Sequence, residues 1–150
     1  MPLVMLPKSN SLGNPKGIYV MKEEMIHAAV LASASADVVS VMYGNGIDVA
    51  YEPVYSGKKP DYKRKVAQIL KNQKSDSGKH VGDAKVVSIH GFEGQGIEPG
   101  YDNYTELGKH PRSAYLECTD NNATYIIKPN LLDQTTSLSK LIEIANSMYK

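Results

Sequence analysis

The sequence predicts a single α+β domain, a mainly antiparallel sheet of about five strands with three helices in the order α-β-β-α-β-β-β-α. Three observations support this fold class. Two strand pairs are joined by short turn sequences, two segments place apolar residues at helical spacing while a third is rich in helix formers, and strands follow one another as hairpins. Hairpins of this kind favour an antiparallel sheet with the helices on one face. Residues 1–20 are then an extended N-terminal arm, and residues 21–150 form the domain.

The N-terminal arm contains many residues that interrupt regular structure. Proline fixes φ and lacks a backbone donor, and glycine leaves the backbone unrestrained. The residues concerned are Pro2, Pro7, Gly13, Pro15 and Gly17. Because the arm offers no periodic apolar face to its own core, we expect residues 1–17 to pack against another copy.

A helix is predicted over residues 21–36, which are rich in helix formers and carry no charge after His27 until Asp37. The chain then runs through residues 38–54, where two alternating strand-like runs flank Gly44-Asn45-Gly46. Asn-Gly tolerates the positive φ angles of a type I′ turn. This stretch therefore predicts the first β-hairpin.

A second helix is predicted to begin at Asp61, its N-cap, and to end by residues 75–82. Its apolar residues recur at the helical spacing i, i+4, i+7 and i+8, as Tyr62, Val66, Ile69 and Leu70. Residues 85–90 resemble a strand. Residues 91–111 are Gly-rich and without periodicity, so we expect a long loop that serves function or contacts a partner.

The second hairpin is predicted from residues 114–118 and 125–127, with a turn at residues 120–122. Pro129 ends it. The C-terminal helix has Thr136 or Ser137 as its cap, and one apolar stripe made of Leu138, Leu141, Ile142, Ala145 and Met148.

Composition restricts the class of protein only weakly. A net charge of +1 gives no global attraction to nucleic acid or to an anionic membrane, and the single Cys118 cannot form an internal disulfide. Residues 1–7 are too short and too Pro-interrupted for a signal peptide, and no apolar run reaches membrane-spanning length. We therefore expect a protein of the cytoplasm or of an assembled particle. Ten Tyr against one Phe indicate a half-exposed sheet or, alternatively, a subunit interface.

The charge distribution is uneven. Residues 58–80 hold eight Lys or Arg and two Asp, a local charge of +6 that leaves −5 for the other residues. This segment is a candidate site for an anion or a partner protein, through Lys58, Lys59, Lys63, Arg64, Lys65 and Lys71. The alternatives are a solvated helix face or complementarity to the acidic surface of a neighbouring copy.

The polar loop is a second candidate, for a metal site or for phosphodiester cleavage by a His pair with Arg112 steadying the charge. Its polar residues are His90, Glu93, Glu98, Asp102, His110 and Arg112. Their spacing matches no metal-binding signature. The glycine runs match neither a P-loop nor a dinucleotide-binding motif, and Cys118 in a strand pattern is expected to be a buried hydrophobe.

These observations favour a non-enzymatic structural protein that assembles with copies of itself, and a viral or phage particle is one setting for such a subunit. The first alternative is a module that binds nucleic acid or another anionic ligand through residues 58–80. The second is a small phosphodiesterase or nuclease, for which His90, His110, Arg112 and Glu93 are the candidate catalytic residues. No motif indicates a cofactor, a metal or a membrane partner.

Overall fold

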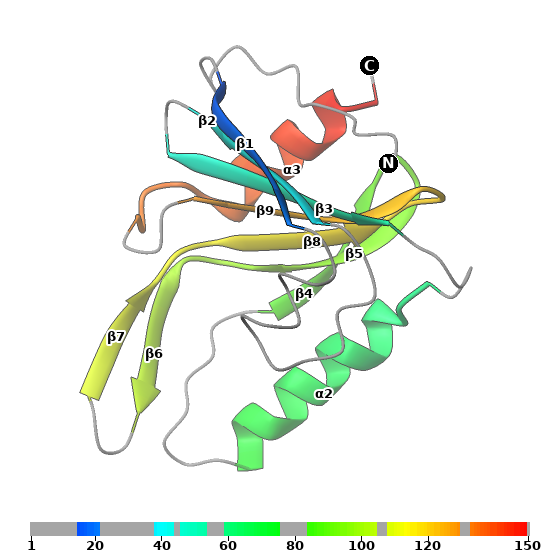
Figure 1. Ribbon diagram of the computed structural model, residues 1–150. Coiled ribbons are helices and arrows are strands. Elements are labelled where there is room, and N and C mark those ends of the chain that lie inside the picture. The colour runs from blue at the N-terminus through cyan, green and yellow to red at the C-terminus, as the bar shows by residue number, and fades with distance from the viewer. Residues whose placement is uncertain are drawn as a thin grey trace.

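The structure is a computed structural model that describes residues 15–21, 38–43, 46–53, 59–75, 84–104, 108–129 and 133–149. Within these ranges lie nine strands and two helices (Figure 1). The elements are β1 (Pro15–Met21), β2 (Val38–Tyr43), β3 (Ile47–Pro53), α2 (Tyr62–Ser75), β4 (Ala84–Ile89), β5 (Phe92–Ile97), β6 (Gly100–Tyr104), β7 (Gly108–Arg112), β8 (Tyr115–Thr119), β9 (Ala123–Pro129) and α3 (Leu138–Ser147).

Seven strands form one sheet in the order β1-β2-β3-β9-β8-β5-β4, and β6 pairs with β7 in a separate two-stranded ribbon. All of these strand pairs are antiparallel. The two halves of the chain meet where β3 pairs with β9, from Ile47 opposite Pro129 to Pro53 opposite Ala123. The predicted α+β class with a mainly antiparallel sheet is therefore confirmed.

All five predicted strands are present, as β2, β3, β4, β8 and β9. Between β2 and β3, Gly46 has a φ of +85° and donates its N–H to the Tyr43 carbonyl at 3.1 Å. Between β8 and β9, Oδ1 of Asp120 accepts from the N–H groups of Asn122 and Ala123 at 2.8 and 2.9 Å. The Asp120 turn thus contains the residue type that its backbone geometry requires. In the first turn Gly46 has the expected positive φ, but its N–H closes the turn onto Tyr43, so Gly46 follows the two central positions and the predicted type I′ turn centred on Asn45-Gly46 is wrong.

The first strand differs from the expectation of an unstructured arm over residues 1–20. Residues 15–21 form β1, which pairs with β2 in the same chain, with Val20 opposite Val39. β-branched and aromatic residues such as Ile18 and Tyr19 favour a strand, and Pro15 is tolerated at its first position. Met21 ends β1, whereas the rest of the predicted helix over 21–36 and of the arm lies outside the described residues.

The expected loop over residues 91–111 is also corrected, because it contains β5, β6 and β7. Its glycines conceal the strand pattern. A Cβ at Gly94 would collide with the backbone carbonyl of Glu117, and one at Gly96 would lie 2.6 Å from Cδ1 of Leu138. Glycine is needed here because β8 and α3 approach the β5 backbone so closely.

The two described helices cover opposite faces of the sheet (Figure 1), whereas the sequence led us to expect both on one face. Neighbouring residues of β8 show this, since successive side chains of a strand point to opposite faces. Leu116 is fully buried in the core beneath α3, and Glu117 pairs with Lys65 of α2.

The predicted apolar stripes are right only in part. In α2, Tyr62 and Val66 are buried but Leu70 is exposed. In α3 the unpredicted Ile144 is buried, while Ile142 is only partly buried. A stripe also does not specify which face of the sheet its helix covers.

The core lies between α3 and the sheet. Leu141 and Ile144 of α3 pack in one cluster with β3, β8 and β9, where Val49, Leu116 and Ile127 are fully buried. Several tyrosines are buried in the domain as well, namely Tyr43, Tyr51, Tyr62 and Tyr125. Among the tyrosines whose side chains the structure describes, these four are buried, whereas Tyr101 is exposed. Among the described helices, none has the length and apolar character needed to cross a membrane.

Candidate functional site

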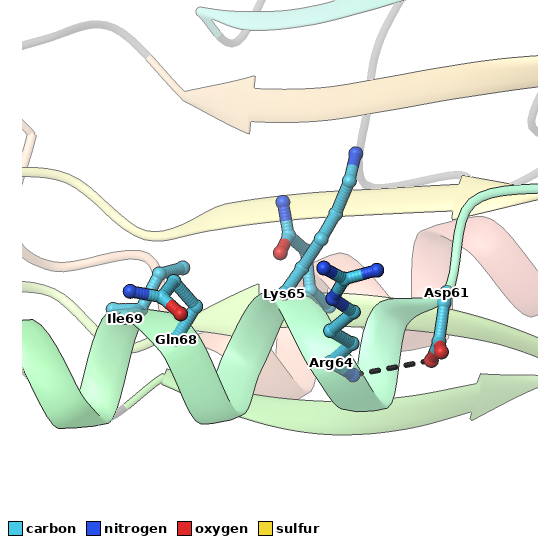
Figure 2. Close-up of a pocket in the computed structure, with 6 residues that line it drawn as sticks. Asp61, Arg64, Lys65, Gln68 and Ile69 are labelled. Atoms are coloured by element: carbon cyan, nitrogen blue, oxygen red, sulfur yellow. Dashed lines mark hydrogen bonds between the residues drawn. The ribbon is translucent and has the colours of Figure 1, made fainter.

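A groove of about 530 Å³ lies beside α2, and its lining combines charged, amide and apolar side chains (Figure 2). These side chains are Asp61, Arg64, Lys65, Gln68, Ile69 and Gln95. Figure 2 shows the charged ends of Arg64 and Lys65 on the same side of α2, with Gln68 and Ile69 further along the helix. The groove therefore has a cationic end, next to a part that contains an amide and an apolar side chain.

The start of α2 is fixed by Asp61, as the sequence predicted. Its Oδ1 accepts from the backbone N–H of Arg64 at 3.1 Å, and its carbonyl accepts from the N–H of Lys65 at 3.0 Å. Tyr62 and Val66 then turn toward the sheet and are buried. Because residues four apart share a face of a helix, Arg64 and Gln68 are held side by side along the groove.

Several lysines of the predicted basic site are paired with acids of their own chain. Nζ of Lys63 lies 3.3 Å from Glu93 of β5, and Nζ of Lys65 lies 3.9 Å from Glu117 of β8. Such exposed pairs stabilise a fold by roughly 0–1 kcal/mol, but they do neutralise charge locally. Part of the acidic complement that we expected on a neighbouring copy therefore lies in the same domain.

The remaining basic residues are placed differently. Lys59 donates to Oδ1 of Asn121 at 2.7 Å and lies 5.2 Å from the centre of the Phe92 ring. Arg64 and Lys71 form no ion pair within the described part of the chain, and Lys58 lies outside it. The structure thus brings only Arg64 and Lys65 of the predicted set into the groove. Binding of nucleic acid through residues 58–80 stays a prediction.

The two histidines of the predicted polar loop are kept apart. His90 lies in the turn between β4 and β5, has a φ of 51° and stacks on Tyr149 at 4.8 Å between ring centres. His110 is exposed in β7, opposite Asp102 of β6. β5 alone, which lies between them, spans roughly 20 Å at 3.3 Å per residue. The described residues therefore do not place this His pair where one imidazole could act as acid and the other as base on one substrate.

The charged residues of that segment mostly contact their own backbone or neighbours. Nη2 of Arg112 donates to the Glu98 carbonyl at 2.8 Å, and the Glu98 carboxylate pairs with Lys85 at 3.1 Å. Glu93 pairs with Lys63, as described above. Within the described ranges, no three His, Cys, Asp or Glu side chains are grouped so that they could hold a metal ion.

Two other groups bear on chemistry. Cys118 is fully buried in β8, and burial raises the pKa of its thiol, so the prediction of a buried hydrophobe is confirmed. Burial also raises the pKa of Tyr62, whose hydroxyl lies 2.7 Å from Oγ1 of Thr119. Both groups keep their protons at neutral pH, so neither is an activated nucleophile or base.

Sequence reasoning missed the amide residues of the groove. Gln95 was hidden inside the Gly-rich segment, although its alternation with Gly94 and Gly96 places it on the opposite face of β5. Its Oε1 is buried and has no hydrogen-bond partner among the residues that the structure describes. Period-two alternation through the glycines was the signal that would have found it.

The outer edge of the sheet is a second surface of interest. β4 is one of the two terminal strands of the sheet as far as it is described, with β1 at the other end, and its Lys85, Val86 and Ser88 are exposed. Three large apolar side chains are exposed within the described ranges, namely Val86 at 38%, Leu70 at 38% and Tyr101 at 54%. Val86 and Leu70 belong to β4 and α2, which pack together at this edge, whereas Tyr101 belongs to the β6–β7 ribbon that projects from the sheet (Figure 1).

Comparisons with protein-family models, with curated proteins and with solved structures find no match to this chain. The function is therefore inferred from the groove and the sheet edge themselves.

Proposed function

We propose that the protein is a non-enzymatic structural subunit that associates with copies of itself through β4. The observation that carries this proposal is the chemistry of that edge. β4 has the sequence AKVVSI, without proline and with Lys85 as its one charge. Natural edge strands are usually protected by proline, by several charges or by a bulge, since their free N–H and C=O groups can pair with another strand.

The few features of β4 that could oppose pairing are weak. Nζ of Lys85 lies 3.1 Å from the carboxylate of Glu98 in the same chain, and this ion pair partly neutralises the lysine charge. Val86 is 38% exposed, although it is a β-branched residue that packs well in a sheet interior. An added antiparallel strand would cover this side chain and satisfy the outer backbone groups of β4.

A two-fold axis perpendicular to the sheet gives the simplest pairing. Residues directly opposite one another on antiparallel strands point to the same face, so a symmetric register is centred on a single residue. Centring on Val86 places this valine opposite itself, and places Lys85 opposite Val87 of the other copy. Both copies of α2 then lie on the same face, and the exposed Leu70 of each contributes further apolar surface beside the axis.

Self-assembly was also expected from the sequence, but there it was based in part on the tyrosine excess and on the basic segment. Four of the tyrosines are buried in the domain, and Lys63 and Lys65 pair with acids of the same chain. The sheet edge takes their place as the supporting observation. A viral or phage particle as the setting of this assembly stays a prediction.

The test is the mass of the full chain in solution, measured by sedimentation equilibrium over a range of concentrations. We expect a concentration-dependent dimer or larger oligomer for the parent. Val86→Lys brings two like charges together at the axis and should shift the protein to monomer. Tyr101→Lys makes the same kind of change on the ribbon, serves as the matched control and should associate like the parent.

Both variants change exposed side chains, so circular dichroism should show both folded. A parent that is monomeric at every concentration would contradict the proposal. So would a Val86→Lys variant that associates as strongly as the parent.

A further inference from the structure

We propose that the groove beside α2 binds a small organic anion, a carboxylate or a phosphate ester, that also carries a hydrogen-bond donor. This site adjoins the β4 pairing proposed above, since Gln95 lies opposite Val86, but none of its lining residues belongs to β4. Its residues come from one helix and one internal strand, and such rigid elements hold a binding site in place better than loops do. Its volume of about 530 Å³ lies within the range typical of pockets for small ligands.

Arg64 is the residue that would bind the anionic group. It makes no ion pair within the described residues, whereas its helix neighbours Lys63 and Lys65 pair with Glu93 and Glu117. Asp61, the acidic residue of the lining, is occupied in capping the helix through its contact with the backbone of Arg64. An arginine guanidinium carries several donors in one plane, and this geometry suits two parallel hydrogen bonds to a carboxylate or phosphate.

Gln95 is the reason why the ligand should carry a hydrogen-bond donor. Its Oε1 is buried without a hydrogen-bond partner in the described part of the chain, and an unpaired buried acceptor is unfavourable unless something donates to it. Its backbone is held between β4 and β8, opposite Val86 and Glu117, so the side chain starts from a fixed position. A ligand N–H or O–H in the groove pairs with this buried oxygen only after the Gln95 amide turns toward the groove.

Ile69 makes an organic ligand a better fit than a bare inorganic ion. It lies on the apolar stripe of α2 and is half-buried, and its side chain lines the same groove as the two amides. An inorganic anion at Arg64 would leave Ile69 and Gln95 uncovered. A ligand with an apolar body between its anionic group and its donor would contact all three kinds of side chain.

Binding is tested by isothermal titration of the full chain with two probes and their neutral counterparts. Adenosine 5′-monophosphate is a phosphate ester with an amino donor, and adenosine lacks its charge. Indole-3-acetate is a carboxylate with a ring N–H, and indole-3-acetamide lacks its charge. We expect at least one anion to bind at least tenfold more tightly than its neutral counterpart, and the one that binds identifies the anionic group.

Arg64→Gln and Lys71→Gln form a matched pair, since each removes one positive charge from an exposed position of α2 and only Arg64 lines the groove. We expect Arg64→Gln to weaken binding at least tenfold and Lys71→Gln to change it less than twofold. Gln95→Met, which keeps the size of the side chain and removes the acceptor, should also weaken binding. The inference is wrong if neither anion binds at millimolar concentration, or if both charge variants weaken binding equally.

Discussion

Gly96 of β5 is expected to be a site where even one added methyl group destabilises the protein, because α3 packs directly onto its backbone. A Cβ at this position would lie 2.6 and 2.7 Å from the two methyl carbons of Leu138 and 3.2 Å from its Cγ. Favourable carbon–carbon contacts are at about 3.5–4.0 Å. Gly96→Ala therefore forces Leu138 or the whole helix to move.

The magnitude follows from how firmly Leu138 is held. It is 1% exposed and belongs to the core cluster with Leu141 and Ile144, so it has no empty space to enter. Overpacking of a core costs about 1–3 kcal/mol. Replacing glycine also stabilises by about 0.4–1 kcal/mol, since alanine restricts the unfolded chain. We expect Gly96→Ala to lower the free energy of unfolding by about 1–2 kcal/mol.

A double-mutant cycle assigns that loss to Leu138. Leu138→Ala alone should cost about 2–5 kcal/mol, since it leaves a cavity. In the double variant the new Cβ enters part of that cavity, so the total should be smaller than the sum of the single losses by about 1–2 kcal/mol. Urea unfolding followed by circular dichroism measures each free energy, provided that the m-values agree.

Gly94→Ala is the matched control for this cycle. Its Cβ would meet the Glu117 carbonyl oxygen and the Cα and Cβ of Cys118, rather than the side chain of Leu138. Leu138→Ala cannot remove that obstacle, so losses from Gly94→Ala and Leu138→Ala should add. If the losses of unfolding free energy from Gly96→Ala and Leu138→Ala simply add, the close contact between β5 and α3 is refuted. It is also refuted if Leu138→Ala reduces the loss from Gly94→Ala as much as it reduces the loss from Gly96→Ala.

Three further predictions concern caps, turns and tyrosines. Ser137→Ala removes the oxygen that accepts from the Lys140 N–H at 3.1 Å and should cost about 1 kcal/mol of unfolding free energy; an unchanged thermal midpoint would show that this cap contributes nothing. Gly46→Val places a β-branched residue at a φ of +85° and should cost about 1–2 kcal/mol or more, measured by urea unfolding, whereas an equally stable variant would contradict the turn. Burial raises the pKa of Tyr51 and Tyr125 above the ordinary value of 10, so their contribution to stability is fully present below pH 10 and is lost as the pH rises above it. Tyrosinate absorbance should therefore rise together with the loss of circular dichroism, and ionisation of these tyrosines in a protein that stays folded would contradict the prediction.

Local sequence signals predicted the elements whose residues decide their own backbone. Asn45-Gly46 and Asp120 predicted the two turns, and Ser137 with the stripe from Leu138 to Met148 predicted α3 and its cap. The strands predicted from alternation all occur. In each case the information lies within a few neighbouring residues, because backbone angles and side-chain periodicity are local properties.

The candidate site was only half visible in the sequence. A cluster of positive charge pointed to Arg64 and Lys65, which line the groove, but it pointed equally to Lys63, which pairs with Glu93 instead. The amide of Gln95 was overlooked because glycines on either side resemble a loop. A run of charges does not reveal which of its members meet an opposite charge from a distant strand.

The sequence by itself determined the α+β class, the antiparallel hairpins, the positions of both turns and most of the buried residues of α2 and α3. Tertiary structure alone decided that β3 pairs with β9, that the helices cover opposite faces, and that Gly94 and Gly96 belong to a strand. The physical reason is the range of the interactions. Turn geometry and periodicity depend on adjacent residues, whereas strand partners, helix faces and close backbone approach depend on atoms that meet only when distant segments pack together.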